Sequence, residues 1–287
     1  MSRPNVCTYE EVIEQDSDAI DFSCDPEFND QRILAEGDSW FTIGGHTLKN
    51  PWFSNILFSL RFRQTTLILN LAQPGDTIKH ISAMPKDFSF KFAIEQHDSY
   101  PWHAILLSGG GNDLIDKAHT LIMDKLERGN KPINKPEDYC KSFAVDHFMQ
   151  NIGHHFERLA RMRGRHNIPI VVHTYDYPTP RNAPARFLGF KLGPWLYKAM
   201  VQAEIPKKDW QGISDYLFNR LADHMLTLPA QIRDFHVVDT RRTLVRAKLN
   251  SKGNSGDWLN EIHPNHQGYK KIAHKIETKL NQVCGIS

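Results

Sequence analysis

The chain has 287 residues, 40% of them hydrophobic, and its net charge is only +2. This length allows one large domain with a substantial core, which we predict over residues 31–287, preceded by an arm over residues 1–30. No apolar run approaches the ~18–20 residues of a membrane span, and the basic residues lack interleaved aromatics, so we exclude a transmembrane protein and a dedicated nucleic-acid binder.

The N-terminal arm is strongly acidic. Residues 1–30 hold nine Asp or Glu residues and one basic residue, Arg3, a net charge of −8 that leaves +10 on the rest of the chain. We expect a solvated arm with a little local structure; the alternative is that it shields a binding face or recruits a partner. The first residues contain no charged start followed by an apolar stretch, so we predict no secretory signal and a cytoplasmic location.

The four cysteines, Cys7, Cys24, Cys140 and Cys284, lie far apart and form no CxxC pair. We therefore expect free thiols of a reducing compartment and no zinc site.

Five short apolar runs indicate strands buried on both faces of a parallel sheet, because their residues do not alternate with polar ones. Amphipathic stretches separate these runs, a succession typical of a doubly wound α/β fold. The predicted strands are Arg32–Ala35, Thr66–Leu71, His103–Ser108, Ile168–His173 and Phe235–Asp239. The predicted helices are Trp52–Arg63, Asp76–Met84, Leu114–Glu127, Ser142–Arg163, Ile213–Leu228 and Gly268–Val283.

The connection from 177 to 208 is unusually long, apolar and interrupted by prolines. A connection of this kind after a strand predicts either a lid or pocket wall, or a peripheral insertion packed on its own apolar patch. If it forms a pocket wall, Phe190 and Trp195 are its candidate substrate-binding residues. Their apolar character favours an acyl or aryl ester over a sugar acetate.

The first predicted strand ends in Gly37-Asp38-Ser39. A glycine permits a tight bend there, and Ser39 then lies at a helix N-terminus, where partial positive charge favours an oxyanion. Alone, the fragment is more typical of an ordinary helix cap.

Two further turns contain candidate oxyanion donors. The second strand is followed by Gly75, whose bare backbone N–H can approach a ligand, and the third by Gly109-Gly-Gly-Asn112-Asp113. A side-chain amide such as that of Asn112 is a suitable oxyanion donor. We predict Asp113 to cap the helix over Leu114–Glu127. The competing interpretation is a dinucleotide-binding loop, but the sequence lacks the GxGxxG motif of such loops.

A candidate base follows the last strand. Pro264 disfavours helix at His263, so we expect its imidazole on a rigid loop. A neutral imidazole can accept the serine proton when a third group holds its tautomer. His263 and His266 could instead suggest a metal pair, but the sequence offers no suitably spaced third ligand.

Together, Gly37-Asp38-Ser39, Gly75, Gly110-x-Asn112-Asp113 and His263-Pro264 resemble the four blocks of the SGNH (GDSL-type) hydrolase family, in the family's order, across roughly residues 31–282. The resemblance implies a flavodoxin-like three-layer α/β/α sandwich with a five-stranded parallel sheet. It implies esterase or lipase activity with Ser39 as nucleophile and His263 as base. The implied oxyanion hole comprises the Ser39 and Gly75 amides and the Asn112 side chain, and neither metal nor cofactor is needed.

The chain departs from the family pattern at one position. The family usually has Asp three residues before the histidine, where this chain has Asn260. An amide can orient an imidazole but supplies no charge to stabilise the imidazolium. We favour Asp257 as the acid, with Asn260 as an orienting partner. Glu261 and a Ser–His dyad remain alternatives.

We therefore expect a serine hydrolase that cleaves small-molecule or lipid esters. An inactive ligand-binding module on the same scaffold is the alternative that the missing aspartate suggests. A nucleotide-binding protein on a flavodoxin-like sheet is the alternative that Gly109–Gly111 suggests. The sequence predicts neither the natural ester nor the oligomeric state.

Overall fold

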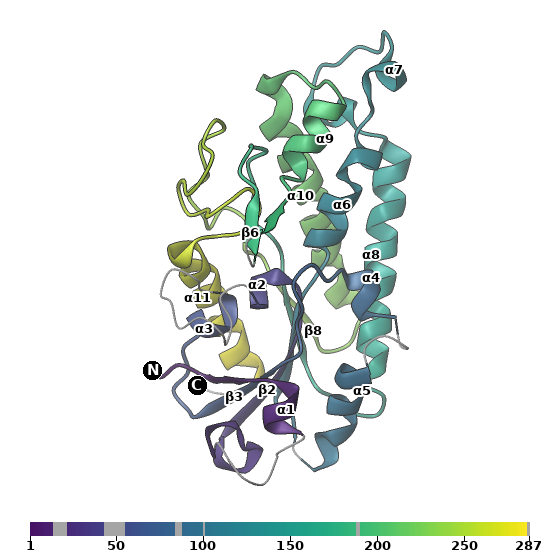
Figure 1. The fold of residues 1–287 in the computed structure, drawn as a ribbon. Helices are drawn as coiled ribbons and strands as arrows, with labels where there is room; N and C mark the ends of the chain where they lie inside the picture. Colours follow the sequence, from purple (N-terminus) through teal and green to yellow (C-terminus); the bar gives the residue numbers. More distant parts are fainter. Residues whose placement is uncertain (14–21, 43–54, 84–87, 100, 188–189, 286–287) are drawn as a thin grey trace.

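The computed structural model describes residues 1–13, 22–42, 55–83, 88–99, 101–187 and 190–285. These residues form a parallel sheet between two layers of helices (Figure 1). The strand order is β1-β3-β2-β4-β5-β8, and every pairing is parallel. The strands are β1 Asn5–Cys7, β2 Gln31–Gly37, β3 Thr66–Asn70, β4 Ala104–Ser108, β5 Ile170–His173 and β8 Phe235–Val238. The predicted three-layer α/β/α fold is confirmed.

The sheet has six strands rather than the predicted five. The additional strand, β1, comes from the acidic arm and pairs with β3 from Asn5↔Leu67 to Cys7↔Leu69. Three residues in a segment without an apolar run are too short a signal for periodicity to detect. The arm therefore contributes an edge strand as well as its charge.

The cysteine prediction is wrong for one pair. Cys7, at the end of β1, forms a disulfide with Cys24, while Cys140 and Cys284 are free. The bond closes a 17-residue separation within the arm. The cysteines consequently no longer support the expectation of a reducing compartment.

Helices cover both faces of the sheet. The short α3 and the C-terminal α11 pack together on one face, and α4, α8 and α10 lie on the other (Figure 1). Their bounds are α3 Ile56–Ser59, α4 Ile78–Ile81, α8 Ser142–Met162, α10 Trp210–Thr227 and α11 His266–Val283. The arm and the strand connections add α1 Tyr9–Val12, α2 Ser39–Thr42, α5 Phe88–Glu95, α6 Gly111–Leu121, α7 Lys125–Arg128 and α9 Leu196–Gln202. Helices α6 to α10 extend beyond the carboxyl ends of the strands (Figure 1).

Three predicted helices differ clearly from the observed ones. The predicted Asp76–Met84 helix is observed only as α4, Ile78–Ile81, and Met84 lies outside the described residues. Within the predicted Trp52–Arg63 helix, the observed helix is α3 alone. It begins after its N-cap, Asn55, and ends at Leu60, where the backbone becomes extended. Residues 52–54 lie outside the described residues. The predicted Leu114–Glu127 helix is two helices, because Ile122 leaves helical geometry and bridges to Cys140. Asp124 then caps α7.

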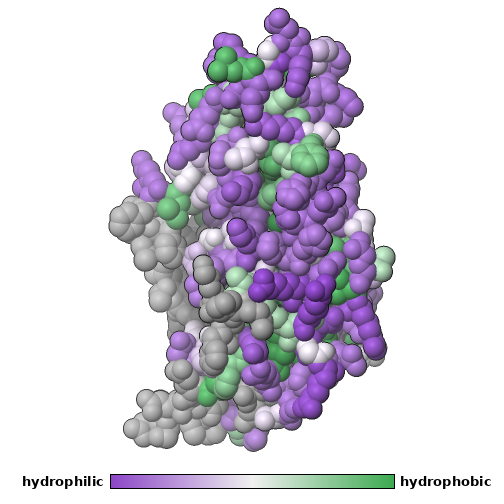
Figure 2. Space-filling model, turned by 90° about the vertical axis from the view of Figure 1, so that its right-hand side faces the viewer, coloured by the Kyte–Doolittle hydropathy of each residue, from purple (hydrophilic) through white to green (hydrophobic). Residues whose placement is uncertain are grey.

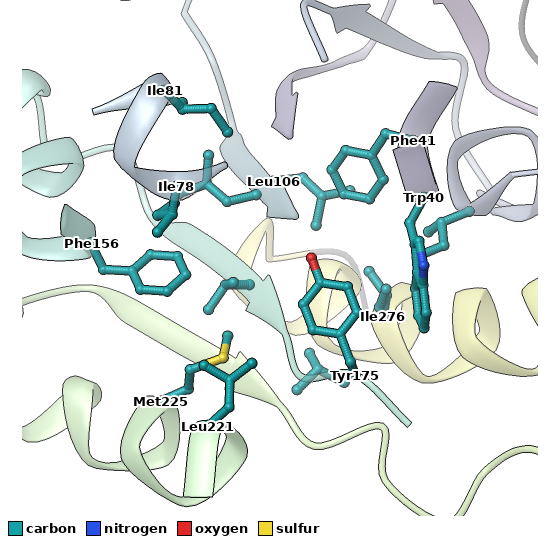
Figure 3. Close-up of a cluster of buried hydrophobic side chains, with 14 of the residues drawn as sticks. Trp40, Phe41, Ile78, Ile81, Leu106, Phe156, Tyr175, Leu221, Met225 and Ile276 are labelled. Atoms are coloured by element: carbon teal, nitrogen blue, oxygen red, sulfur yellow. The ribbon is translucent and has the colours of Figure 1, made fainter. Parts of the chain in front are cut away.

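The core lies between the sheet and the helices on its two faces. Figure 3 shows Phe156 of α8 and Leu221 and Met225 of α10 packed near Tyr175, with Trp40 of α2 on the other side. The face turned toward the viewer in Figure 2 is mainly hydrophilic, with scattered hydrophobic residues. No helix within the described ranges is both long and apolar enough to cross a membrane.

The connection 177–208 contains a two-stranded antiparallel hairpin, β6 Ala185–Phe187 and β7 Phe190–Leu192, followed by α9. Its described parts are tied to the chain around residue 261, since the backbone N–H of Glu261 donates to Ala183 O at 2.9 Å. Whether it acts as a lid stays a prediction.

Candidate active site

The candidate residues gather at the carboxyl ends of the strands, where open α/β sheets bind ligands. Ser39 follows β2, Gly75 follows β3, Asn112 follows β4, and His263 lies on the long connection after β8. Strands β3, β2 and β4 are neighbours in the sheet, so the turns after them lie side by side. A separation of 224 positions in the sequence does not keep the serine and the histidine apart in space.

Ser39 is the first residue of α2, directly after β2. The turn depends on Gly37, because a Cβ atom at this position would lie 2.5 Å from the Ser108 carbonyl oxygen on β4. This close approach lets Ser108 Oγ donate to Asp38 Oδ1 at 2.8 Å. The same Asp38 oxygen accepts from the Trp40 backbone N–H at 2.9 Å. Asp38 therefore caps α2 and fixes the position of the serine beside it.

A buried hydrogen-bond network surrounds Asp38, and sequence reasoning missed it. The Tyr175 hydroxyl donates to Asp38 Oδ2, and His173 Nε2 lies 3.1 Å from Ser108 Oγ. The Trp40 ring stacks on His173 with centroids 5.5 Å apart. Burial raises the pKa of Tyr175 well above its usual value and lowers that of His173, so both rings are neutral. The available signal was that two predicted strands end in polar residues, Ser108 and His173.

His263 contacts the candidate nucleophile directly. Its Nε2 lies 2.8 Å from Ser39 Oγ, and both residues are buried. The loop around it is closed by backbone bonds from Leu259 N to His263 O at 2.9 Å and from Asn265 N to Asp257 O at 2.8 Å. Trp40 Nε1 also donates to Ile262 O at 3.2 Å, which ties α2 to this loop.

Asn260 determines the tautomer of His263. Its Oδ1 accepts from the backbone N–H groups of Ile262 at 3.1 Å and His263 at 2.9 Å, so this atom is the amide oxygen. The same oxygen lies 3.0 Å from His263 Nδ1. Since an amide oxygen can only accept a hydrogen bond, Nδ1 is the donor and carries the proton. Nε2 therefore presents its lone pair to the Ser39 hydroxyl, the arrangement that general-base catalysis requires.

Burial lowers the pKa of His263 to about 3. The imidazole is therefore neutral at physiological pH and available as a base. Asn260, unlike a carboxylate, adds no negative charge to oppose this effect.

The prediction that Asp257 orients His263 is wrong. Asp257 Oδ2 accepts from the Val245 backbone N–H and from Lys271 Nζ, each at 2.6 Å. Glu261 also faces elsewhere: its buried carboxylate accepts backbone N–H groups from a different part of the chain. Neither acid is bonded to the imidazole. The residue that contacts Nδ1 is the one three positions before the histidine, Asn260.

Two of the candidate oxyanion donors lie on the turns after β3 and β4, the strands that flank β2. Asn112 is in the first turn of α6, and its Nδ2 donates to Asp76 O at 2.9 Å, joining the turn after β3 to the helix after β4. A side-chain amide has two N–H donors, and this bond uses one of them. Gly75 is an exposed turn residue next to Asp76.

Asp113 caps a different helix from the predicted one. Its carboxylate accepts from Ile78 N at 2.8 Å and Lys79 N at 3.4 Å, at the start of α4. Burial raises its pKa to about 6, against the opposing effect of these N–H donors. The N-cap of α6 is instead Gly110, in the left-handed region with a φ of 97°.

The two predicted substrate-binding residues belong to the 177–208 connection. Trp195 is half-buried and precedes α9. Phe190 begins β7, but its side chain lies outside the described residues.

The structure shows no metal cluster at this site within the described part of the chain. Among the residues that the structure describes, the one group of candidate ligands is Cys7, Glu11 and Cys24, and the disulfide occupies its two sulfur atoms. His266 begins α11, and Asn265, which caps that helix, separates it from Pro264.

Comparison with known proteins gives matches in structure alone. No family model matches the chain, and no curated protein does. Among solved structures, an acetylxylan esterase (Axe2) from Geobacillus stearothermophilus shares 12% sequence identity and a TM-score of 0.45, with 90% of this chain and 95% of that chain covered. The SGNH-hydrolase family esterase AlinE4 shares 17% identity and a TM-score of 0.34, with 72% and 75% covered.

A protein of Arabidopsis thaliana gives 10% identity and a TM-score of 0.44, with 88% of this chain and 98% of that chain covered. Solved structures similar to this chain thus include SGNH-hydrolase family esterases, the family that its four sequence blocks resemble.

Proposed function

We propose that this chain is a serine hydrolase that cleaves carboxylic esters through an acyl-enzyme on Ser39. The observation that carries the proposal is the 2.8 Å contact between Ser39 Oγ and His263 Nε2, with the tautomer held by Asn260. The resemblance of the four sequence blocks to SGNH hydrolases supports it independently.

In the first half-reaction, His263 Nε2 takes the Ser39 proton while Oγ attacks the ester carbonyl carbon. The carbonyl π electrons move to oxygen, and the candidate donors for this oxyanion are the amides of Ser39 and Gly75 and the side chain of Asn112. The intermediate collapses, the bond to the alcohol oxygen breaks, and the imidazolium returns its proton to that oxygen. The alcohol leaves and the acyl group stays on Ser39.

In the second half-reaction, a water molecule replaces the alcohol. His263 accepts one proton from the water as its oxygen attacks the acyl carbon, and then returns that proton to Ser39 Oγ as the serine ester breaks. The carboxylic acid is released with the enzyme unchanged. Asn260 stabilises the imidazolium in both halves as a hydrogen-bond acceptor only.

A fluorophosphonate probe tests this proposal, because it labels a serine only when a base activates it. We expect wild type to be labelled and to hydrolyse p-nitrophenyl acetate, and we expect Ser39→Ala and His263→Ala to lose both properties. The matched control is Ser82→Ala, because Ser82 is buried and bonded to His155, outside the site.

The alternative, a ligand-binding module that has lost catalysis, predicts a folded wild type that the probe does not label. The proposal fails if that result is obtained with protein whose thermal transition is cooperative.

A further inference from the structure

Two buried side chains of opposite charge join the connection 177–208 to the loop of the candidate base. We call residues 251–263 the base loop. Arg181 belongs to the connection and Glu261 to the base loop, and both are 0% exposed. Figure 1 shows the chain before α11, drawn in yellow, beside the hairpin of this connection, and the backbone bond from Glu261 N to Ala183 O joins the two. The mechanism above assigns a role to neither charged residue.

The Arg181 guanidinium reaches two separate points of the base loop. Its Nη1 donates to Ser251 Oγ at 2.9 Å, to Ser251 O at 3.4 Å and to Gly253 O. Its Nη2 donates to the backbone carbonyl oxygen of Asn260. The planar guanidinium holds these donors in a fixed fork. Because the described chain between β8 and α11 contains no helix or strand, such side-chain contacts help to determine its shape.

Asn260 is the residue through which the Arg181 contact reaches the base. Its side-chain Oδ1 lies 3.0 Å from His263 Nδ1, whereas its backbone N–H makes a long bond, 3.5 Å to His263 O. The bond from Arg181 to the Asn260 carbonyl therefore fixes the peptide that follows Asn260, and with it the direction in which the side chain leaves the backbone. A small displacement of that side chain would weaken its bond to the imidazole, because hydrogen bonds require a narrow range of distance and angle.

Glu261 holds the same two segments together in the opposite sense. Its carboxylate accepts the backbone N–H groups of Arg181 at 3.2 Å, Leu196 at 3.2 Å and Tyr197 at 2.7 Å. The connection is thus bound to the residue directly after Asn260, while the Arg181 side chain returns to Asn260 itself. These reciprocal contacts give the base loop a rigid support, as a precisely placed base requires.

Stability alone does not explain a fully buried guanidinium. Taking a charge out of water is unfavourable, and replacing buried charged side chains by apolar ones of similar volume is often neutral or stabilising. Arg181 Nε, moreover, has no hydrogen-bond partner among the residues that the structure describes, so the loss of water at this atom is not compensated. A buried charge of this kind is better explained by the single loop conformation that it specifies.

We propose that Arg181 is a positioning residue for the base: by holding the Asn260 carbonyl, its guanidinium keeps the Asn260 side chain where it orients His263. Glu261 completes the arrangement by holding the connection from which Arg181 extends. The inference rests on the proposed ester hydrolysis and adds to it the means by which the base is kept in place. It gives the connection 177–208 a role in addition to the predicted one of a lid or pocket wall.

The kinetic test uses Arg181→Met, which keeps an unbranched side chain and removes every donor. We expect kcat for p-nitrophenyl acetate to fall about 10-fold or more, because a small misplacement of a catalytic group slows the chemistry. Acylation and deacylation both use His263, so KM should stay within about 3-fold of the wild-type value. Arg181→Lys keeps the charge without the fork and should fall between wild type and Arg181→Met.

The matched control is Arg163→Met, which removes a similar buried guanidinium at the opposite edge of the sheet. Arg163 donates to the carbonyl oxygens of Ala160 at 3.0 Å, Ile168 at 2.8 Å and Arg233 at 2.8 Å, near the amino ends of β5 and β8. We expect this variant to lower the midpoint of thermal unfolding and to leave kcat within about 3-fold of the wild-type value.

A double-mutant cycle with Asn260→Ala tests the route of the effect. If Arg181 acts through Asn260, Arg181→Met should lower kcat less than about 3-fold further once the Asn260 side chain is gone. A merely structural role of Arg181 predicts the same loss in both backgrounds.

A spectroscopic measurement separates this inference from the proposed function, because it requires no turnover. Long-range ¹H–¹⁵N correlation spectra distinguish the two tautomers of a neutral histidine, and the His263 signals are those lost in His263→Ala. We expect the Nδ1–H tautomer in wild type, in Ser39→Ala and in Arg163→Met, and a mixture of tautomers in Arg181→Met.

Any one of three results with folded Arg181→Met would overturn the inference: an unchanged tautomer, an unchanged kcat, or equal losses of kcat with and without the Asn260 side chain. If Arg181→Met does not fold, Arg181→Lys serves in the same comparisons. Absence of ester turnover and probe labelling in wild type would refute the proposed hydrolysis, and the tautomer spectra would then decide alone whether Arg181 positions the imidazole.

Discussion

Replacing Asn260 by aspartate tests the proposed mechanism most directly. Asn260 Oδ1 lies 3.0 Å from His263 Nδ1, and the same oxygen accepts two backbone N–H groups. An aspartate of the same shape can keep all three bonds. Asn260→Asp therefore changes the charge beside the imidazole while preserving its tautomer, whereas Asn260→Ala removes the acceptor that holds that tautomer.

The size of the effect follows from Coulomb's law. Two unit charges about 4 Å apart interact by about 4 kcal/mol at an effective dielectric constant of 20. This attraction is present only when His263 is an imidazolium, as in the transition states for acylation and deacylation. Incomplete ionisation of a buried carboxylate reduces the gain. We therefore expect Asn260→Asp to raise kcat about 10-fold or more, and Asn260→Ala to lower it about 10²-fold or more.

The pH dependence provides a second measurement. The imidazole is a base only when neutral, so kcat/KM rises with pH through the pKa of His263 and is level above it. Because burial lowers that pKa to about 3, wild type should keep full kcat/KM at pH 5, where an ordinary histidine is mostly protonated. The carboxylate of Asn260→Asp favours the imidazolium, so the acid limb should move to higher pH.

The assay is the pH profile of kcat/KM for p-nitrophenyl acetate between pH 4 and pH 9, with thermal unfolding of each variant as the folding control. If Asn260→Asp folds like wild type but changes neither kcat nor the acid limb, Asn260 does not act on His263 and the reasoning is refuted.

Three further predictions concern residues around the site and the acidic arm. Asp257→Asn should leave kcat within about 3-fold of the wild-type value and lower the free energy of unfolding by about 1 kcal/mol. The reason is that Asp257 bonds to a lysine and a backbone N–H and not to His263. Turnover measures the first effect and denaturant unfolding the second. Tyr175→Phe leaves Asp38 Oδ2 without its hydroxyl donor, so the unfolding free energy should fall by about 1–3 kcal/mol and kcat should fall as well; unchanged values would contradict the network. Reducing Cys7–Cys24 opens a 17-residue separation and should cost about 3 kcal/mol of unfolding free energy in denaturant titrations with and without dithiothreitol.

The central sheet could be predicted because its strands are apolar on both faces. The run Ile168–His173 is apolar up to Val172, and the observed β5, Ile170–His173, begins two residues later than predicted. Strand β1 could not be predicted in this way, because its stability comes from pairing with β3 rather than from an apolar run of its own. Helix ends were predicted less well where a tertiary contact ends the helix, as the bridge between Ile122 and Cys140 does after α6.

The position of the candidate site was predictable for a related reason. Parallel strands place their carboxyl ends at one edge, so polar residues after separate strands converge whatever their separation in sequence. Ser39, Asn112 and His263 each follow a recognisable strand end or rigid turn. The network of Asp38, Ser108 and Tyr175 was not predicted, because only the register Gly37↔Ser108 places these side chains in contact.

The residue that orients His263 could not be predicted from the sequence. Asp257, Asn260 and Glu261 are all close enough in sequence to meet the imidazole, and charge alone favours either acid. In the structure, backbone N–H groups determine which residue meets the imidazole. Asp257 accepts the N–H of Val245, and Glu261 accepts an N–H at the start of α9. Only Asn260 has its oxygen turned inward by two N–H groups of its own loop. An acid whose hydrogen bonds go to other partners does not orient the histidine, whereas the neutral amide that contacts Nδ1 sets its tautomer. The missing carboxylate is therefore a reason to expect weaker stabilisation of the imidazolium, and not a reason to expect an inactive site.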